Sequence, residues 1–489
     1  MRILNTLKKN SSYFTVFCLT ILYALFLSVN PVGDAYSNAY SSLYAEDMLK
    51  PHHLLYCLYG NLILKIFGFL HLEPMIILQL SNAVVAGGCL LVLRRIIKRI
   101  NPDEIFLTSS VLFCGACFGF MRFATDNECY MIPLLFSLLT IYYIQVFLIK
   151  NTFSRICKAA ICVVFACLFH QLAILVWLCV AGVLLFSCNK KYTLCFLSIS
   201  FAIPLLYALA AFLTTGNISA QGTIEFALTD YLSGNAQMPQ LKQVLLLTFV
   251  SLVRTFVQVH GYMFEFIGSN LVICIIVFAF VAIFAVLAII AFVKDKHRSL
   301  KLFQEKRFVR MLWVLLILTI SFAAFSNGNA EFMTMIPFLL VVLHAYYFTS
   351  YRAVILFAFA LLLWNICFAL YPLGRIEMTP NEKLAEMVLN NKNAVFVLKD
   401  KNVVENICLY KYGNIGNVAL KHAYKYTKEE YESDKASGKT IITDAIGGKE
   451  SINRASVTQK VNFAFDEVKN PLVLLKFSSP MCKRMVCKL

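Results

Sequence analysis

Charged residues are scarce in this sequence. They make up 15% of its 489 residues, against about 25% in an average soluble protein. Hydrophobic residues make up 60%, and the mean hydropathy is +0.72, which excludes an ordinary soluble globular chain. The long apolar runs also lack alternation of apolar and polar residues, which excludes a transmembrane β-barrel and leaves membrane helices.

A cysteine framework is missing as well, although the chain has 17 cysteines. Most of them lie inside apolar runs, where cysteine acts as a small hydrophobic residue. No two Cys-x-x-Cys segments stand at zinc spacing, and the single match, Cys114 and Cys117, lies within an apolar run. Cys482 and Cys487 near the C-terminus are the one pair that we expect to be able to form a disulfide, and only in an oxidising compartment.

Basic residues outnumber acidic ones and give a net charge of +17, but they do not indicate nucleic acid as a partner. Lys and Arg gather in short stretches between apolar runs, at 94–99 and 294–307, as in the inner loops of membrane proteins. We therefore expect a multi-pass integral membrane protein with its N-terminus in the cytoplasm.

Apolar runs that approach the thickness of a bilayer predict about eleven transmembrane helices. The expected spans are 13–29, 74–93, 105–121, 130–149, 156–169, 172–187, 192–213, 267–293, 308–325, 333–348 and 353–371. With the basic loops inside, the outer side receives two long loops, 31–73 and 214–266. Each is expected to contain an interfacial helix, at 51–70 and 241–260.

The composition changes after residue 374, where Lys, Glu, Asn and Asp become frequent. Short strand-like runs alternate there with polar helical stretches; the strands are expected at 394–398, 440–443 and 472–477, and the helices at 381–390 and 427–437. We predict a transmembrane module over 1–374 and a small soluble α/β domain over 375–489, placed on the outer side.

Titratable side chains gather at the outer ends of the expected spans and in the outer loops, although basic residues alone set the topology. Ionisable groups in this position are costly and are usually functional. The candidate site residues are Asp34, Glu46, Asp47, His52, His53, Arg122, Asp126, Glu128, His170, Arg254 and Glu331.

Asp34, directly after the first apolar run, is the candidate general base, because partial desolvation would raise the pKa of its carboxylate. The alternative is a polar residue that hydrates a helix end. His52, His53, Arg122 and Arg254 are candidate donors to a phosphate. The alternatives are that the two histidines only extend to the membrane interface and that Arg122 is a simple charge partner. Glu46 and Asp47 either position a substrate or hold a metal, or they are simply solvated. Asp126, Glu128, His170 and Glu331 bind substrate or have a structural role.

Several of these segments resemble a known class. Asp34 after the first span, PHHLLYCLYGNLILKIFG at 51–68, and FMRFATDNECY with Glu128 and Tyr130 are similar to motifs of the GT-C class of integral-membrane glycosyltransferases, most closely its protein O-mannosyltransferase-like branch. ACLFHQLAI, with His170, is similar to a later histidine-containing hairpin of that class. The likeness covers roughly 10–190 and is looser over 300–375, and the prolines of the branch's His-Pro segment are missing after His53.

The resemblance implies a GT-C-like helical bundle with outer interfacial helices. It implies an inverting transfer of a sugar from a polyprenyl-phosphate donor to a hydroxyl of a glycan, lipid or protein at the outer membrane face, with Asp34 as the base. No cofactor is certain, and a divalent metal stays an open alternative. A bacterial inner membrane, with the C-terminal domain in the periplasm, is the favoured location.

Two other functions remain as alternatives. A transporter or flippase of lipid-linked saccharides would have internal repeats and polar groups near mid-membrane, and we find neither in the sequence. A polymerase of lipid-linked saccharides would have a large arginine-rich outer loop, whereas 214–266 contains only Arg254.

Overall fold

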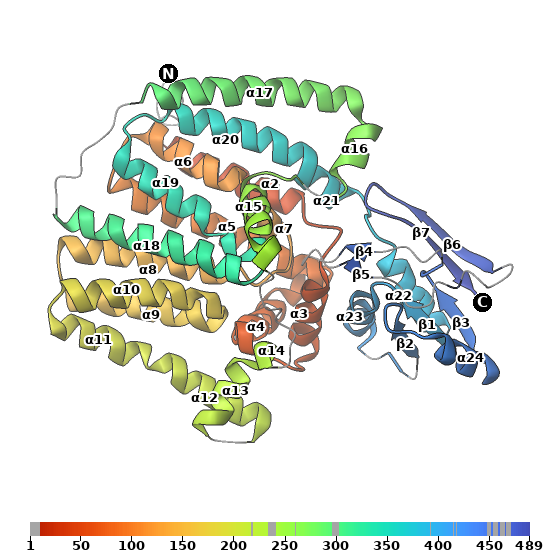
Figure 1. Ribbon diagram of the computed structural model, residues 1–489. Coiled ribbons are helices and arrows are strands. Elements are labelled where there is room, and N and C mark those ends of the chain that lie inside the picture. The colour runs from red at the N-terminus through yellow and green to blue at the C-terminus, as the bar shows by residue number, and fades with distance from the viewer. Residues whose placement is uncertain are drawn as a thin grey trace.

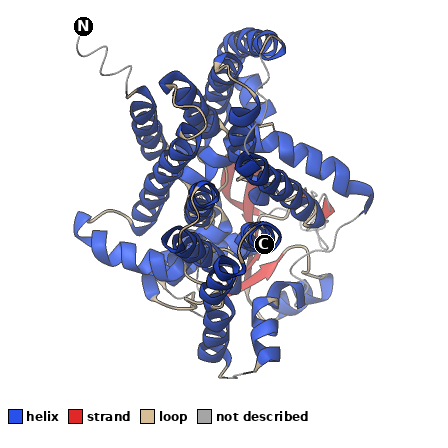
Figure 2. Cartoon of the chain, turned by 90° about the vertical axis from the view of Figure 1, so that its left-hand side faces the viewer, coloured by secondary structure: helices blue, strands red, loops and turns tan. Residues whose placement is uncertain are grey.

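The computed structural model describes residues 10–216, 219–232, 241–259, 261–295, 303–391, 393–413, 415–416, 418–446, 451–452, 458–459, 465 and 471–489. Long helices that run roughly side by side form most of the molecule, and a small domain with a β-sheet lies at one end of them (Figure 1). Figure 2 looks along the bundle, with the strands behind the helices.

The first half of the bundle contains two helices that lie in the first predicted outer loop, α3 and α4. Its elements are α2 (Ser11–Leu25), α3 (Gly33–Tyr44), η1 (Pro51–His53), α4 (Tyr56–Phe67), η2 (Gly68–Leu70), α5 (Pro74–Lys98), α6 (Glu104–Ala116), α7 (Phe118–Thr125), α8 (Met131–Ile149), α9 (Phe153–Phe169), η3 (Gln171–Ala173), α10 (Ile174–Ser187), α11 (Lys190–Ser200) and α12 (Ala202–Thr215).

The second half begins with short helices and continues with long apolar ones. Its elements are α13 (Ala220–Ala227), α14 (Thr229–Leu232), α15 (Leu241–Phe256), α16 (Met263–Ser269), α17 (Leu271–Val293), α18 (Phe303–Phe325), η4 (Ala330–Met333), α19 (Ile336–Tyr347), α20 (Arg352–Asn365), the π-helical turn η5 (Ile366–Leu370) and α21 (Tyr371–Arg375). Parts of the predicted loop 214–266 and of the basic stretch 294–307 lie outside the described residues.

Fewer helices than expected are long enough to cross a membrane alone. In the described part of the chain, seven have the required length and apolar composition, and an eighth results if α6 and α7, bent by 69°, count as one span. Helix α2 has only 15 residues, which is short of the roughly 20 that a bilayer core requires. The helical membrane module is therefore shown, whereas eleven crossings stay a prediction.

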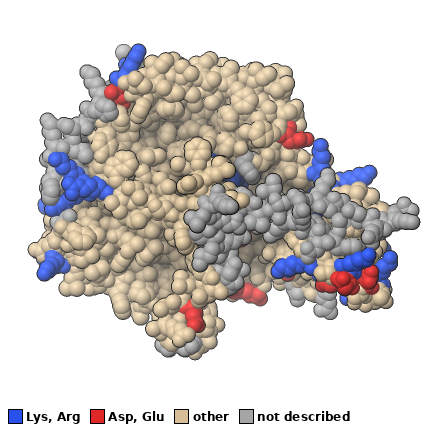
Figure 3. All heavy atoms as spheres, in the orientation of Figure 1, with Lys and Arg blue, Asp and Glu red and all other residues tan. Residues whose placement is uncertain are grey.

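Charge is distributed along the bundle as a membrane requires. On the face shown in Figure 3, Lys and Arg gather at the end far from the sheet and on the sheet domain itself, and few charged side chains are visible among the described residues between them. One charged pair is buried near the far end: Arg94 donates to Glu104 at 3.2 Å and to the Ser12 hydroxyl at 2.5 Å. Glu104 also accepts from the Ser12 backbone at 3.1 Å, so the pair ties α2 to α5 and α6.

The C-terminal domain has a mixed five-stranded sheet in the order β2-β1-β3-β7-β6. Its elements are α22 (Asn381–Asn390), β1 (Ala394–Leu398), α23 (Lys401–Tyr412), β2 (Ala419–His422), α24 (Lys428–Ala436), β3 (Thr440–Thr443), β6 (Leu472–Ser478) and β7 (Lys483–Lys488), with β4 (Ser451–Ile452) and β5 (Thr458–Gln459) as a separate pair. Strand β1 is parallel to β2 and β3, and β7 is antiparallel to β3 and β6.

The strands and helices expected in this domain are confirmed, but β2, α23 and β7 were missed. Arg484 on β7 donates to the buried Asp444 at 3.1 Å and also to Asp400. Asp444 directly follows β3, and Asp400 lies just after β1. The expected disulfide is wrong: Cys482 and Cys487 are both free, and Cys487 is buried.

The core of this domain extends into the membrane module. Tyr36 and Ala39 of α3, with Met75 and Leu78 of α5, belong to the same buried cluster as side chains of α22, α23 and β1. Helix α3 is thus packed between the two parts of the chain.

Candidate functional site

Helix α3 carries Asp34 in its first turn. Asp34 and Asn38 are four residues apart and therefore lie on one face, which borders a cavity of about 920 Å³ at the sheet end of the bundle. A carboxylate in the first turn of a helix is also favoured by the helix dipole. Asp34 itself is exposed, so the structure does not supply the partial desolvation that the sequence suggested.

Eight of the predicted site residues line this cavity. They come from α3, η1, α7, the turns before α8 and η3, α15 and η4, and they are Asp34, His52, His53, Arg122, Glu128, His170, Arg254 and Glu331. Segments that are far apart in the sequence therefore converge, as expected from the common membrane face assigned to them.

Three predicted residues do not line the cavity. Glu46 is exposed and accepts a hydrogen bond from the Tyr40 hydroxyl, and Asp47 is exposed with a left-handed φ of 47°. Asp126 is buried, and its carboxylate accepts the Asn127 backbone N–H at 2.8 Å, which makes it part of the cavity's support. We leave these three out of the proposed site because they do not line the cavity.

The turn that holds Glu128 is fixed by buried amides. Asn82 of α5 donates to the backbone oxygens of Asp126 and Glu128, both at 2.8 Å. Asn127 accepts from the Tyr56 hydroxyl at 2.8 Å and donates to the Ala35 backbone oxygen at 2.8 Å. Asn127 thus links this turn to α3, the helix of Asp34.

Burial and neighbouring carboxylates tune the acids of the site. Burial, followed by the charges of Glu331, Asp126 and Asp34, raises the pKa of Glu128 well above its usual value of 4.5. Burial likewise raises the pKa of Asp126, while Arg122 opposes the change. Glu128 is therefore held toward its protonated form, in which it can donate a hydrogen bond.

Three histidines stand close together in the cavity wall. The rings of His53 and His170 are 6.5 Å apart, and those of His52 and His53 are 6.5 Å apart. Burial and the charge of His52 lower the pKa of His170 to about 4, and burial also lowers that of His53. The Leu172 backbone N–H donates to Nδ1 of His170 at 3.1 Å, so a neutral His170 ring carries its hydrogen on Nε2 and can donate it.

Two arginines supply positive charge. Arg122 belongs to α7, and Arg254 to α15, where its guanidinium lies over the Phe118 ring at 5.7 Å from the centroid. Some apolar side chains that line the same cavity are exposed, among them Ile174, Val250 and Phe325. The cavity thus combines polar groups with an apolar surface suited to an apolar chain.

Sequence reasoning missed several polar lining residues, including Asn38 and Gln171. Gln171 donates to the backbone oxygens of Pro51 and Ala227, both at 2.9 Å, and so fixes the η1 turn. Asn38 could have been found by its spacing of four residues from Asp34 if α3 had been recognised as a helix.

The described residues offer no grouped ligands for a metal ion. No three His, Cys, Asp or Glu side chains stand close enough together there to hold one. Among the described residues, Glu46 and Asp47 therefore do not belong to a group of side chains that could hold a metal ion.

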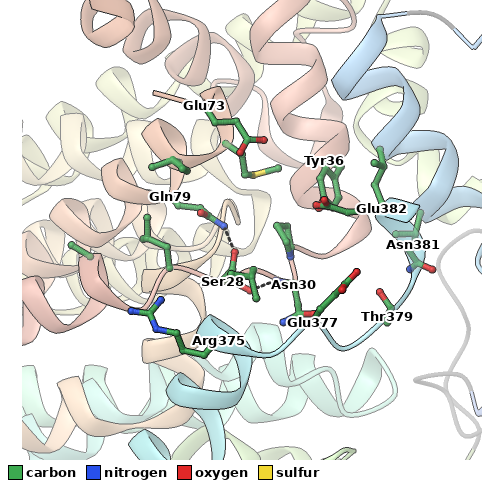
Figure 4. A pocket seen from close by; sticks show the side chains of 18 of the residues that line it. Ser28, Asn30, Tyr36, Glu73, Gln79, Arg375, Glu377, Thr379, Asn381 and Glu382 are labelled. Carbon is green, nitrogen blue, oxygen red and sulfur yellow. Dashed lines mark hydrogen bonds between the residues drawn. The ribbon is translucent and has the colours of Figure 1, made fainter. Parts of the chain in front are cut away.

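A second cavity, of about 520 Å³, lies between α2, α5 and the C-terminal domain. Figure 4 shows Glu73, Glu377 and Glu382 around it, with Arg375 on the bundle side. Tyr36 of α3 reaches into it and donates to Glu382 at 2.7 Å. Since Pro31 lines this cavity and Asp34 the other, the start of α3 separates the two.

Known proteins were compared by sequence and by structure. No protein-family model matches the sequence, and no curated protein matches it. An oligosaccharyltransferase from Archaeoglobus fulgidus, in a crystal structure with Zn and sulfate, is similar with a TM-score of 0.52 at 10% identity, over 92% of this chain and 73% of that one. This chain shares the fold of that oligosaccharyltransferase. The oligosaccharyltransferase AglB from Archaeoglobus fulgidus, in complex with an inhibitory peptide and a dolichol-phosphate, is similar with a TM-score of 0.51 at 10% identity, over 95% of this chain and 75% of that one.

A shared fold is all that these matches establish, because identity is only 10%. ArnT from Cupriavidus metallidurans covers 97% of both chains, but its TM-score of 0.41 is too low to support an argument. The finer likeness to the protein O-mannosyltransferase-like branch has no counterpart among these matches.

Proposed function

We propose that this protein is a membrane glycosyltransferase that moves a sugar from a polyprenyl-phosphate donor to an acceptor hydroxyl. The observation that carries the proposal is that Asp34, Arg122 and Arg254 line one cavity together with exposed apolar side chains. A base, cations for a phosphate and a path for a lipid tail are the three requirements of this chemistry. The fold shared with an oligosaccharyltransferase supports it.

The reaction that we propose is a single displacement at the anomeric carbon. Asp34 takes the proton of the acceptor hydroxyl, and the oxygen attacks C1 from the side opposite to the phosphate. The bond between C1 and the phosphate oxygen breaks, and polyprenyl phosphate leaves with the electron pair. Since phosphate is a good leaving group without a proton, one carboxylate base is sufficient and the configuration at C1 inverts.

Arg122 and Arg254 would neutralise the charge that develops on the phosphate, which is the usual way in which preorganised donors lower such a barrier. His52, His53 and His170 would donate hydrogen bonds to the phosphate or to the sugar. Glu128, held toward its protonated form by burial and by neighbouring carboxylates that raise its pKa, would donate to a sugar hydroxyl, and Glu331 would accept from one.

The proposed setting is the outer face of a bacterial inner membrane, with the C-terminal domain in the periplasm. This orientation rests on the basic stretches between spans and on the gathering of Lys and Arg at the end of the bundle far from the cavity (Figure 3).

Reconstituted protein would be given a panel of polyprenyl-phosphate sugars with a membrane extract as the acceptor source, and release of polyprenyl phosphate would be followed. We expect the wild type to consume one donor, Asp34→Asn to consume none, and Asp47→Asn to behave as wild type, because Asp47 lies outside the cavity. Equal activity of Asp34→Asn and wild type would refute the role of the base. If intact donor moves between the leaflets and no polyprenyl phosphate is released, the transporter hypothesis is favoured over the transferase.

A further inference from the structure

Two faces of helix α3 have different surroundings. Asp34 and Asn38 border the large cavity, whereas Tyr36 and Ala39 are buried in the cluster that also holds Val404, Ile407 and other side chains of the C-terminal domain. The helix has no side-chain cap at its N-terminus, where Val32 is the N-cap residue. Its first turn is therefore held by contacts from elsewhere in the chain.

The C-terminal domain supplies several of these contacts. Asn406 of α23 donates from Nδ2 to the Gly33 backbone oxygen at 3.1 Å, next to Asp34 in the sequence. Glu382 of α22 accepts from the Tyr36 hydroxyl at 2.7 Å (Figure 4). At the other end of α3, the Tyr44 hydroxyl donates to the Tyr410 backbone oxygen at 3.4 Å.

Close packing reinforces the contact at Gly33. A Cβ built at this position would lie 3.3 Å from Cγ2 of Val403 and 3.9 Å from Nδ2 of Asn406. Gly33 has an ordinary helical conformation and is not among the glycines with positive φ. The side chain is therefore absent here because α23 approaches closely, not because the backbone requires glycine.

We propose that the C-terminal domain positions the general base: α23 and α22 hold the first turn of α3 so that Asp34 faces the cavity. Asn406 and Glu382 are then positioning residues, which act through Asp34 and do not touch the substrate. The proposal rests on the proposed function, since it assumes that Asp34 is the base. The C-terminal domain would then contribute to catalysis by holding Asp34 in place.

The pair Gly33 and Val403 offers a sharp test. Gly33→Ala would push the start of α3 away from α23 by a few tenths of an ångström, and small misplacements of a catalytic group are costly. We expect kcat to fall about tenfold, with the KM for the donor unchanged within about twofold. The matched control is Gly68→Ala in the same loop, where a Cβ would meet nothing within 4 Å, and its kcat should equal that of the wild type.

Rescue separates positioning from damage to the fold. Val403→Ala removes the methyl group that an alanine at 33 would press against, so Gly33→Ala/Val403→Ala should recover most of the lost kcat. Asn406→Leu should also lower kcat at constant KM, because leucine fills a similar volume but cannot donate to the Gly33 oxygen. All rates are divided by the folded fraction, measured by size-exclusion chromatography and thermal unfolding in the same detergent.

The outcomes for the proposal and for the function can be told apart. If Asp34→Asn is inactive but Gly33→Ala and Asn406→Leu turn over as wild type, the positioning role is refuted and the proposed function stands. A loss of kcat in Gly33→Ala that Val403→Ala does not relieve also refutes it. If Asp34→Asn is as active as wild type, Asp34 is not the base, and the positioning role that depends on it is refuted as well. If the wild type consumes no donor, the proposed function itself fails.

Discussion

The Tyr130 hydroxyl donates to a Glu331 carboxylate oxygen at 2.9 Å, across 201 residues of sequence. Tyr130 precedes α8, and Glu331 lies in η4, before α19. Asn329 also donates to this carboxylate, at 3.4 Å. The bond closes one wall of the large cavity and joins two segments that the sequence placed at the same membrane face.

Removing this bond should lower stability. Tyr130→Phe is expected to cost about 1.5 kcal/mol, because a hydrogen bond to a carboxylate is lost from a partly buried site. The measurement is unfolding of Tyr130→Phe, Glu331→Gln and the double variant in one detergent. A double variant whose loss equals the sum of the single losses would show that the two groups are not coupled.

Glu128→Gln should stabilise the protein, and increasingly so as the pH rises above 4.5. Burial and the neighbouring carboxylates raise the pKa of Glu128 above 4.5, so ionising it costs folding free energy once the pH exceeds the unfolded value. Glutamine resembles the protonated form and does not ionise. Thermal midpoints of both proteins against pH test this, and a difference that shrinks with rising pH would contradict it.

Acidification should destabilise the protein through its buried histidines. Burial lowers the pKa of His170 from 6.5 to about 4, so the unfolded chain binds a proton there that the folded one does not. This contribution to stability is complete above about pH 6.5 and falls as the pH drops toward 4. His170→Gln should flatten this part of the curve, although His53 contributes in the same direction.

The matched control for that experiment is His71→Asn. His71 is exposed and has a left-handed φ of 52°, which asparagine also adopts at little cost. Its curve of stability against pH should follow that of the wild type. A His170→Gln curve as steep as the wild-type curve between pH 4 and 6.5 would contradict the assignment.

Arg94 should matter for stability and not for chemistry. It is buried beside Glu104 at the end of the bundle away from the cavity, and losing one partner of a buried pair costs about 3 to 5 kcal/mol. Arg94→Met should be much less stable than Arg94→Met/Glu104→Gln, in which no carboxylate is left alone. The rate per folded molecule should be unchanged in both, and a selective loss of rate would contradict this.

The helical bundle followed from the sequence because apolar runs and basic stretches report directly on a membrane. The count of crossings did not follow, since α2, α9 and α10 are apolar but short, and α6 and α7 form one bent pair. In the C-terminal domain the apolar strands β1 and β3 were predictable. Strand β2 was not, because only four residues pair there and all are partly exposed.

The candidate site followed in outline for a different reason. Polar residues at the ends of spans must lie at one membrane face, which brought Glu128, His170 and Glu331 to the same cavity. The sequence could not separate Glu46 and Asp47 from the site, because that depends on the orientation of α3. This orientation is set by packing against α23, more than 350 residues away in the sequence, and no local pattern reveals it.

The most direct measurement is a single turnover of a bound, labelled polyprenyl-phosphate sugar by wild type and by Asp34→Asn, with a membrane extract as the acceptor source. Both proteins should bind the donor with Kd values within about threefold of each other, since Asp34 acts on the acceptor. The account predicts release of polyprenyl phosphate at least about a hundredfold slower from Asp34→Asn, the usual loss when a general base is removed. Release at the wild-type rate, with the donor equally bound, would contradict it.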